Sequence, residues 1–486
     1  MSRLLAALVS SVLVFAQEPA PRPLGIQGLP AQYRGTPDPA YRSEAARLAR
    51  EIVEKGRAYV DLEELCDDIG PRLTGSDRLR QAQDWAMAKL RAYGAENVHE
   101  EVHEFPRSWT RGVAKARLLN ANGQELHLAQ MAWSPATPGP VRGEVALLES
   151  GTLAEFKQRM PQLSGKIVLM GQLPRPRVGE DRAAFYRDLM GLYAAATFKA
   201  ALVDSEKKGD LLGMGGAAGG GPRAARVPTA FVTAEHAALL KRLVARGRKP
   251  EIELELGGRL GEAPVPVSNI VAEIRGSESP AEVVIVGGHF DSWDLGTGAT
   301  DNGTGAVSAI ETLRAMKALG LKPRRTLRVI LFYGEEQGLL GSRAYVQAHE
   351  KELKDIQAVL INDLGSGRIT GWPSMGQEAW IPFLGQAMAS ANILGCQEIS
   401  PYTTPGDTDH WPFFLKGVPA FAATQEVLDY FTATHHSQLD TFDHVVKADF
   451  LQGCQVLAVT AWGFLQMPGR LPHAPPREGR PAAATQ

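Results

Sequence analysis

Side chains that can bind a divalent metal occur in five short motifs in the second half of the sequence. The motifs are GGHFDSWDLG (287–296), TDNGTG (300–305), GEEQGLLGS (334–342), IND (361–363) and HHSQLDT (435–441). Mixed imidazole and carboxylate ligands without cysteine are typical of catalytic zinc sites that are open to water. The candidate ligands are His289, Asp301, Glu335, Glu336, Asp363, His435 and His436.

Each of these side chains has an ordinary structural explanation when it is taken alone. Asp301 before Asn-Gly is typical of a turn or helix cap, and a Glu-Glu pair usually lies on a solvated face. Their joint position is less ordinary, because every motif follows a predicted strand, where α/β sheets place their ligands. Like charges gathered there repel one another unless cations neutralise them. The pattern therefore predicts a metal centre at one edge of a sheet.

Two further acids could orient the imidazoles. Asp291 lies two residues after His289, on the same side of an extended chain, so its carboxylate could accept the other ring N–H of His289. Asp440 could do the same for His436. Both could equally be turn acids.

The elements that position these motifs form an alternating α/β pattern from about residue 266. Apolar strands are predicted at 283–287, 327–333, 358–362 and 418–423, and helices between them at 307–319 and 340–349. Continuous apolar strands separated by helices indicate a sheet that is buried on both faces.

The N-terminal part contains two predicted helices. Residues 17–43 are rich in proline and read as a linker or surface arm. The first helix begins near Ser43, and the second runs over 78–93 and ends at Gly94. Their apolar sides are predicted to be Ala46, Leu48, Ile52 and Val53 in the first helix and Ala82, Trp85, Ala86 and Leu90 in the second.

Residues 118–265 differ in character, because short β-like runs dominate there and one helix is predicted over 235–245. The glycine-rich stretch LLGMGGAAGGG (211–221) lacks the Gly-Lys-[Ser/Thr] ending of a phosphate-binding loop and is interpreted as a mobile surface loop.

Composition excludes some classes of function and indicates export. The 486 residues carry a net charge of −2, so no basic excess attracts nucleic acid. Arg3 and the apolar run 4–15 resemble a signal peptide, predicted to cover 1–16, and the alternative is a buried N-terminal helix. We therefore expect a periplasmic or extracellular protein without a membrane span. The three cysteines form no CxxC pair, and we expect buried small apolar side chains.

With these motifs, and with GPRLTGS at 70–76, the chain resembles the two-zinc exopeptidase family that includes leucyl aminopeptidases and glutamate carboxypeptidases. The resemblance implies an α/β fold with a mixed, mostly parallel central sheet flanked by helices. It places the peptidase domain at 44–117 and 266–467, a β-rich protease-associated domain inserted at 118–265, and a disordered tail at 468–486. Relatives suggest a homodimer.

The family pattern also implies two zinc ions per chain and a role for each residue. Asp301 matches the bridging carboxylate, and the peptide bond to Asn302 is expected to be cis. Glu335 matches the general acid/base, and His435 stands where some relatives carry a tyrosine that faces the substrate carbonyl. The implied ligands are His289 and Asp363 for one ion and Glu336 and His436 for the other.

The implied reaction is hydrolysis of dipeptides or short peptides with unblocked termini; the alternatives are an aminopeptidase acting on longer peptides, a glutaminyl-cyclase-like acyltransferase and an inactive binding protein on the same scaffold. Asp407 and Asp409 could pair with a substrate α-amine or only stabilise their loop. Tyr402 and Asn302 are further candidates for substrate contact.

Overall fold

The computed structural model describes residues 24–25, 39–149, 151–171, 174, 176, 180–216, 226–403 and 408–477. The predicted signal peptide at 1–16 therefore lies outside the described residues. Among the helices in the described ranges, none combines the length and the apolar character needed to cross a membrane.

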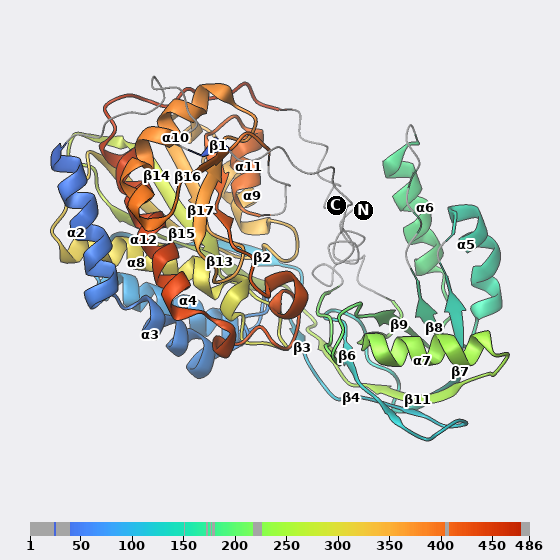
Figure 1. The fold of residues 1–486 in the computed structure, drawn as a ribbon. Helices are drawn as coiled ribbons and strands as arrows, with labels where there is room; N and C mark the ends of the chain where they lie inside the picture. Colours follow the sequence, from blue (N-terminus) through green and yellow to red (C-terminus); the bar gives the residue numbers. More distant parts are fainter. Residues whose placement is uncertain are drawn as a thin grey trace.

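A six-stranded mixed sheet forms the centre of the larger body (Figure 1). Its order is β19-β16-β14-β15-β13-β2, and the first three neighbouring pairs are parallel while the last two are antiparallel. The mixed, mostly parallel sheet predicted from the sequence is confirmed. The strands are β2 (Glu96–Phe105), β13 (Val265–Ile274), β14 (Ser279–His289), β15 (Arg325–Phe332), β16 (Ile356–Ile361) and β19 (Ala420–Ala422).

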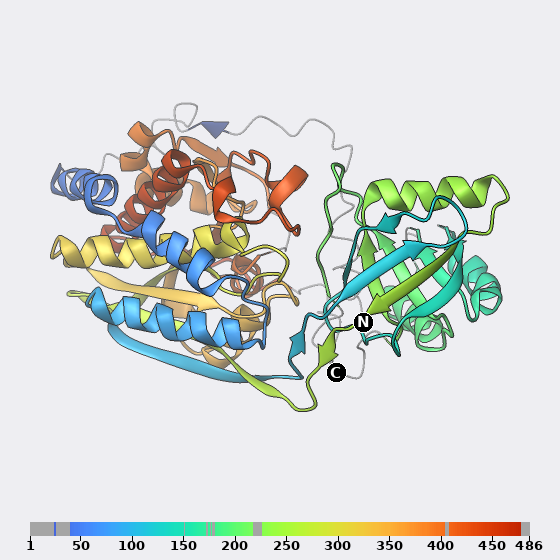
Figure 2. The ribbon, with the colours of Figure 1, turned by 90° about the horizontal axis from the view of Figure 1, so that it is seen from below.

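Helices cover both faces of this sheet (Figure 2). Helices α4, α8 and α12 pack on one face, with α2 and α3 outside them, and α9 and α11 pack on the other. This double cover explains why β15 and β16 are apolar almost throughout. The helices are α2 (Pro39–Lys55), α3 (Ala58–Glu63), α4 (Asp77–Ala92), α8 (Thr304–Ala318), α9 (Leu340–Ala348), α10 (Ile381–Ala387), α11 (His410–Leu415) and α12 (Lys447–Gln466).

The buried stripes of the first two long helices differ in part from the prediction. In α2 the core side is Ala45, Leu48 and Ile52, whereas Val53 is 54% exposed, so the predicted inclusion of Ala46 and Val53 is wrong. Helix α4 begins as expected, because the Ser76 hydroxyl caps it by accepting from the Leu79 N–H at 3.1 Å. Its buried side chains are Leu79, Ala82, Gln83, Ala86, Met87 and Leu90, and Trp85 is only half-buried.

A second sheet of eight strands, which we call the insert sheet, lies beside the larger body with its own helices (Figures 1 and 2). Its order is β5-β4-β11-β7-β8-β9-β10-β6, with separate apolar clusters on its two faces. Its elements are β4 (Ala114–Leu118), β5 (Glu125–Leu126), β6 (Leu128–Gln130), β7 (Val141–Leu148), α5 (Leu153–Arg159), β8 (Ile167–Met170), α6 (Arg182–Ala194), β9 (Ala200–Asp204), β10 (Thr229–Val232), α7 (Ala234–Ala245) and β11 (Glu251–Leu256).

Two short strands join the two bodies, and an apolar cluster fills the junction. Strands β3 (Trp109–Thr110) and β12 (Arg259–Leu260) pair between the insert sheet and the central sheet. The junction cluster contains Trp133 and Met214 from the insert side and Trp293 and Tyr333 from the larger body. A smaller sheet flanks the site and consists of β1 (Leu24–Gly25), β17 (Ile369–Pro373), β18 (Glu398–Ser400) and β20 (Thr424–Gln425).

Three loop predictions need correction. The proposed linker 17–43 contains β1 and the first turns of α2. Residues 468–477 of the predicted disordered tail pack on the larger body, where the Trp380 Nε1–H donates to the Pro472 carbonyl at 2.7 Å, and residues 478–486 lie outside the described residues. Residues 213–216 of the glycine-rich stretch are buried at the junction rather than exposed on a surface loop. A Cβ on Gly216 would lie 2.7 Å from the Trp133 ring, which explains why glycine is needed there.

Candidate metal centre

The register of the central sheet brings the predicted ligands to one edge. His289 is the last residue of β14 and pairs with Phe332, the last residue of β15, three positions before Glu335. Gly287 pairs with Ile361 at the end of β16, two positions before Asp363. Parallel strands that end at the same level therefore deliver three loops to the same place.

His289, Asp301 and Asp363 form one half of the cluster. The His289 Nε2 lies 3.2 Å from the Asp301 Oδ1 and 3.2 Å from the Asp363 Oδ1. The His289 Nδ1 lies 2.9 Å from the backbone carbonyl of Asp291, which accepts its proton and leaves the Nε2 lone pair facing the carboxylates. This is the tautomer that can bind a metal through Nε2.

His436, Glu336 and the same Asp301 form the other half. The His436 Nε2 lies 3.0 Å from the Glu336 Oε2 and 3.4 Å from the Asp301 Oδ2. The Asp301 Oδ2 and the Glu336 Oε1 are buried without a hydrogen-bond partner. Buried carboxylate oxygens without donors are costly, and a cation at each half would satisfy them. The donor set therefore fits two metal ions with Asp301 between them.

Glu335 lies beside the cluster in a different electrostatic position. Its backbone N–H donates to the Asp291 Oδ1 at 3.1 Å, which fixes the start of the Glu335-Glu336 turn. Burial raises the pKa of Glu335 well above its usual value, against the opposing charge of His289, and the Asp363 carboxylate adds to the rise. A carboxylate in this setting has a strong affinity for a proton.

His435 stacks on His436, with ring centroids 3.8 Å apart. Burial lowers the pKa of His435 to about 3, and the neighbouring His436 adds to that effect, so its ring is neutral at neutral pH. Tyr430, which sequence reasoning missed, packs against His435 at 4.9 Å between ring centroids. Burial raises the pKa of Tyr430 well above its usual value, and the charges of Asp301 and Asp363 add to the rise.

Asp291 and Asp440 do not support the imidazoles in the way that was expected. The Asp291 carboxylate accepts from the Thr74 Oγ1–H at 2.9 Å, and it is the Asp291 backbone carbonyl that accepts from His289. The Asp440 Oδ1 accepts from the Thr300 N–H at 2.6 Å and from the Thr300 hydroxyl at 2.8 Å. Asp440 therefore positions the segment that carries Asp301, and the predicted contact with His436 is wrong.

Arg72 is a buried positioning residue to which the sequence analysis, which used GPRLTGS only as a family motif, gave no role. It is 0% exposed, and its guanidinium donates to the carbonyls of Phe290, Thr297 and Gly298 at 2.7–2.8 Å. These bonds hold the loop between β14 and Asp301. The planar fork of arginine suits several carbonyls at once, which is the reason for this residue type here.

The four candidate substrate contacts have different outcomes. Asp409 is fully buried, and burial raises its pKa to about 7 while the Asp363 charge adds to the rise, so it belongs to the same acidic site. Asn302 is buried and its side chain bonds the Asn362 carbonyl and the Gly305 N–H, which leaves it unavailable to substrate. Tyr402 lies after β18, where its N–H donates to the Ser400 Oγ at 3.3 Å, and Asp407 lies outside the described residues.

Two further observations concern the backbone and the insert. The Asp301–Asn302 peptide bond is cis, as expected. Lys207, in the loop after β9 of the insert sheet, reaches the segment 430–438 that carries His435 and His436, where its Nζ donates to the Phe431 carbonyl at 3.2 Å. The positive charge of Lys207 acts on Asp301, His435 and His436, so the Lys207 ammonium lies close to the cluster. The sequence contained no pattern that could place a residue so distant along the chain beside the site.

The described cysteines Cys66, Cys396 and Cys454 are all free and buried. Burial raises the pKa of each thiol, to about 12 for Cys66. The expectation that they serve as small apolar side chains is confirmed.

Comparisons with known proteins agree with this geometry. Residues 269–461 match the model of peptidase family M28. The chain is 32% identical over 428 residues to carboxypeptidase Q of Mus musculus, covering 86% of this chain and 88% of the relative, and 31% identical to carboxypeptidase Q of Homo sapiens over the same shares.

Solved structures show the same fold. The peptidase M28 precursor of Shewanella amazonensis SB2B superposes with a TM-score of 0.78 at 29% identity and covers 90% of this chain and 99% of that one. A zinc aminopeptidase of Bacillus subtilis has a TM-score of 0.64 at 21% identity over 85% and 95% of the two chains, which supports the fold alone. The chain therefore belongs to peptidase family M28 and is a metallo-exopeptidase.

Proposed function

We propose that this chain is an exported two-zinc exopeptidase that hydrolyses dipeptides or short peptides with unblocked termini. The observation that carries the proposal is the gathering of the five implied ligands around the two halves of one cluster, with Glu335 beside it and free of that ligand set. Export rests on the pattern of residues 1–16.

His289 and Asp363 would hold one zinc ion and Glu336 and His436 the other, with Asp301 shared between them. When bound, such a pair supplies a water of lowered pKa and polarises the scissile carbonyl. The hydrogen bond from His289 Nδ1 to the Asp291 carbonyl keeps the imidazole in the binding tautomer. Arg72 and Asp440 hold the loops that carry His289 and Asp301 in place.

Glu335 takes the proton from the attacking water and delivers it to the leaving amine. Burial and the neighbouring Asp363 carboxylate raise the pKa of Glu335, which strengthens its affinity for the proton that it takes from the water. Its neighbour Glu336 is committed to His436 at 3.0 Å, so the two glutamates divide the roles of base and ligand. Acid/base assistance of this kind contributes on the order of 10²–10⁴-fold in rate.

The termini of a short substrate have two candidate partners. Asp409 offers a buried carboxylate within the acidic site, suited to an α-amine. Lys207 offers an ammonium from the insert side, suited to an α-carboxylate. Recognition of both free ends, by Asp409 and by Lys207, would favour a dipeptide over a long peptide. A longer peptide would leave the ammonium of Lys207 without a carboxylate partner.

The test is the Glu335→Gln variant. We expect it to abolish hydrolysis of unblocked dipeptides, with at least a hundredfold loss of kcat, while zinc content stays near two ions per chain. Glu350→Gln, which alters an exposed ion pair with Lys416, is the matched control and should retain full activity. Chelation should inactivate the native enzyme and zinc should restore it. Substantial turnover by Glu335→Gln, or indifference to chelators, would refute the mechanism.

A further inference from the structure

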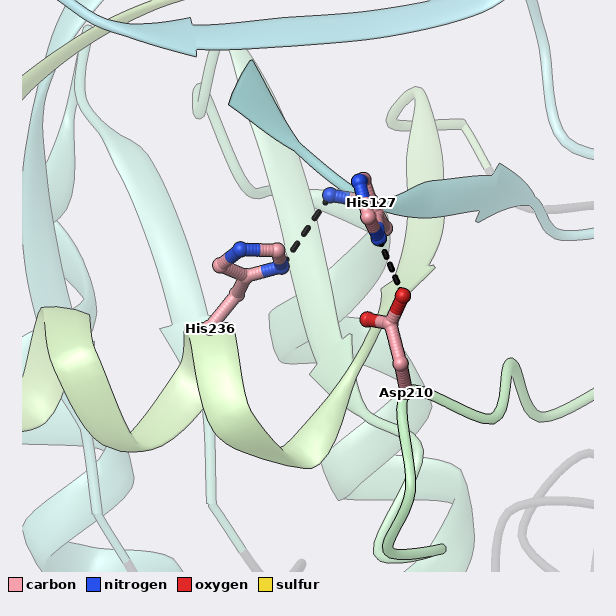
Figure 3. Close-up of side chains that lie close together, drawn as sticks. All are labelled: His127, Asp210 and His236. Atoms are coloured by element: carbon pink, nitrogen blue, oxygen red, sulfur yellow. Dashed lines mark hydrogen bonds and ion pairs between the residues drawn. The ribbon is translucent and has the colours of Figure 1, made fainter. Parts of the chain in front are cut away.

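A second group of metal-binding side chains lies in the insert, outside the cluster of the peptidase domain. His127, Asp210 and His236 each offer one ligand atom, and these three atoms lie within 4.8 Å of one another. Figure 3 shows the Asp210 carboxylate and the His127 imidazole facing each other, with the His236 ring on helix α7 beside them. The three residues come from three separate elements, so their approach is a product of the fold.

Each of the three positions is fixed by its local structure. His127 is the single residue between β5 and β6, and His236 lies in the first turn of α7. Asp210 follows Gly209 in a turn where both residues have positive φ, 61° for Asp210 and 82° for Gly209. The Glu235 carboxylate accepts from the N–H groups of Gly209 and Asp210, at 2.9 and 3.3 Å, and so holds this turn against the start of α7. A left-handed Asp turn held by an adjoining acid is a preorganised arrangement.

The side chains present the right atoms for a cation. The His127 Nδ1 contacts the Asp210 Oδ2, and the two histidine rings stand 5.0 Å apart between centroids at 82°. The His236 Nδ1 lies 3.1 Å from the backbone nitrogen of His127 and 2.8 Å from the Thr233 Oγ1, and an ion bound at Nδ1 would displace both contacts. The side chains of His127 and Asp210 are 57% and 49% exposed, so water can complete the coordination shell.

We propose that His127, Asp210 and His236 form a third metal site, which takes a divalent transition ion such as zinc. Two imidazoles and one carboxylate are the donor set that such ions prefer, and hard cations such as Mg²⁺ prefer oxygen ligands instead. This inference is independent of the proposed function, because it uses none of the residues assigned to catalysis.

Hydrogen bonds connect the proposed third site to residues 436–438, which include the proposed catalytic ligand His436. The Gln438 Nε2–H donates to the Asp210 carbonyl at 3.3 Å, and the Leu212 N–H donates to the Gln438 Oε1 at 2.8 Å. The Met214 N–H then donates to the carbonyl of His436 at 2.9 Å. An ion bound by Asp210 therefore fixes the loop 209–214, which holds the backbone of a ligand to the catalytic metals.

The experiment compares the number of zinc ions in the full chain and in the double variant His127→Ala/His236→Ala. Both proteins are stripped, loaded with a small excess of zinc, separated from free metal and measured by mass spectrometry of the element. We expect the double variant to hold one ion fewer per chain. The His349→Ala variant removes a different histidine–carboxylate pair, with Glu101, and should hold as many ions as the native chain.

The third site is tested by the difference in zinc count between the native chain and the double variant, which should be one ion whatever the catalytic cluster binds. The proposed two-zinc cluster is tested by the zinc count that remains in the double variant. Failure of one proposal can therefore be told from failure of the other. Asp210→Asn keeps the size of the side chain and serves as the second variant; it should bind the third ion at least tenfold more weakly. Zinc added beyond two equivalents should raise the melting temperature of the native chain and leave that of the double variant unchanged. Equal ion counts in native and variant chains, or zinc stabilisation that is equal in both, would overturn the proposal.

Discussion

At the scale of single residues, backbone carbonyl groups accept hydrogen bonds that were expected to go to side chains. A carbonyl group, that of Asp291, accepts the His289 proton, and three carbonyls anchor Arg72. Every residue carries a carbonyl, so a sequence gives no indication of which one an imidazole or guanidinium will use. The residues of the cluster could be proposed as ligands from the sequence, because only a few side-chain types bind metals.

Lys207 leads to a prediction about specificity. In Lys207→Met, dipeptides with a free carboxylate should show a KM raised at least about tenfold, because the partner of the carboxylate is lost. Dipeptides amidated at the C-terminus should be hydrolysed as before, since they carry no negative end. Steady-state kinetics with paired free and amidated dipeptides measure both effects. Lys208→Met, an exposed neighbour, is the control, and an equal change for both substrate types would contradict the assignment.

His349 leads to a prediction about stability and pH. Its Nε2 lies 2.7 Å from the Glu101 Oε1, and this hydrogen bond raises the pKa of His349 above its usual value of about 6.5. A histidine with a raised folded-state pKa contributes stability that is fully present below the unfolded-state pKa and is lost as pH rises through the folded-state value. The melting temperature of the native chain should therefore exceed that of His349→Gln most at about pH 6, with the difference shrinking above pH 7. A difference that grows toward alkaline pH would contradict this.

At the scale of elements, the glycine-rich loop shows why close approach matters. A Cβ on Gly216 would lie 2.7 Å from the Trp133 ring and 3.0 Å from Trp293, whose ring is 6.0 Å from that of His436. In Gly216→Ala we expect the crowded junction to cost about 1–3 kcal/mol of stability and to lower kcat by displacing Trp293.

The matched control for this substitution is Gly191→Ala, in α6, where an added Cβ meets nothing within 4 Å. It should leave kcat unchanged, and alanine in place of a helical glycine should stabilise the protein by roughly 0.5–1 kcal/mol. Thermal unfolding and kinetics of the two variants provide the comparison. Normal kcat and stability in Gly216→Ala would show that the junction is not tightly packed.

At the scale of elements, some strands and helices could be predicted from the sequence and others could not. Strands β14, β15 and β16 and helices α7, α8 and α9 were predicted within a few residues, because apolar runs and turn residues mark them clearly. Helix α12 was missed, since its buried residues extend around the whole circumference and leave no polar stripe to reveal a helical period. Val53 of α2 was wrongly predicted to be buried. The helical period of apolar residues does not show where the neighbouring helix ends and leaves α2 exposed to solvent.

At the scale of the whole molecule, the insert contributes to the site although no ligand of the catalytic cluster comes from it. Its loop 207–214 delivers Lys207 and touches the segment around His436. Sequence motifs predicted the residues that the structure brings together in the cluster, but contacts between segments more than 200 residues apart depend on how two bodies pack. That packing is set by the junction cluster, which contains side chains from both.

The coupling between insert and catalytic segment can be followed by hydrogen exchange. The N–H groups of Leu212 and Met214 donate to Gln438 and His436, so their protection depends on the segment that carries His436, a proposed zinc ligand. Removing zinc should speed exchange of these two amides by about tenfold or more, while amides in β7 and β8 at the centre of the insert sheet keep their protection. Asp210→Asn separates the contribution of the proposed third site, because its loop should exchange faster even with the catalytic cluster loaded. Uniform loss of protection through the insert would instead mean that the whole domain unfolds with the metal, and unchanged exchange at Met214 would mean that the two bodies are not coupled.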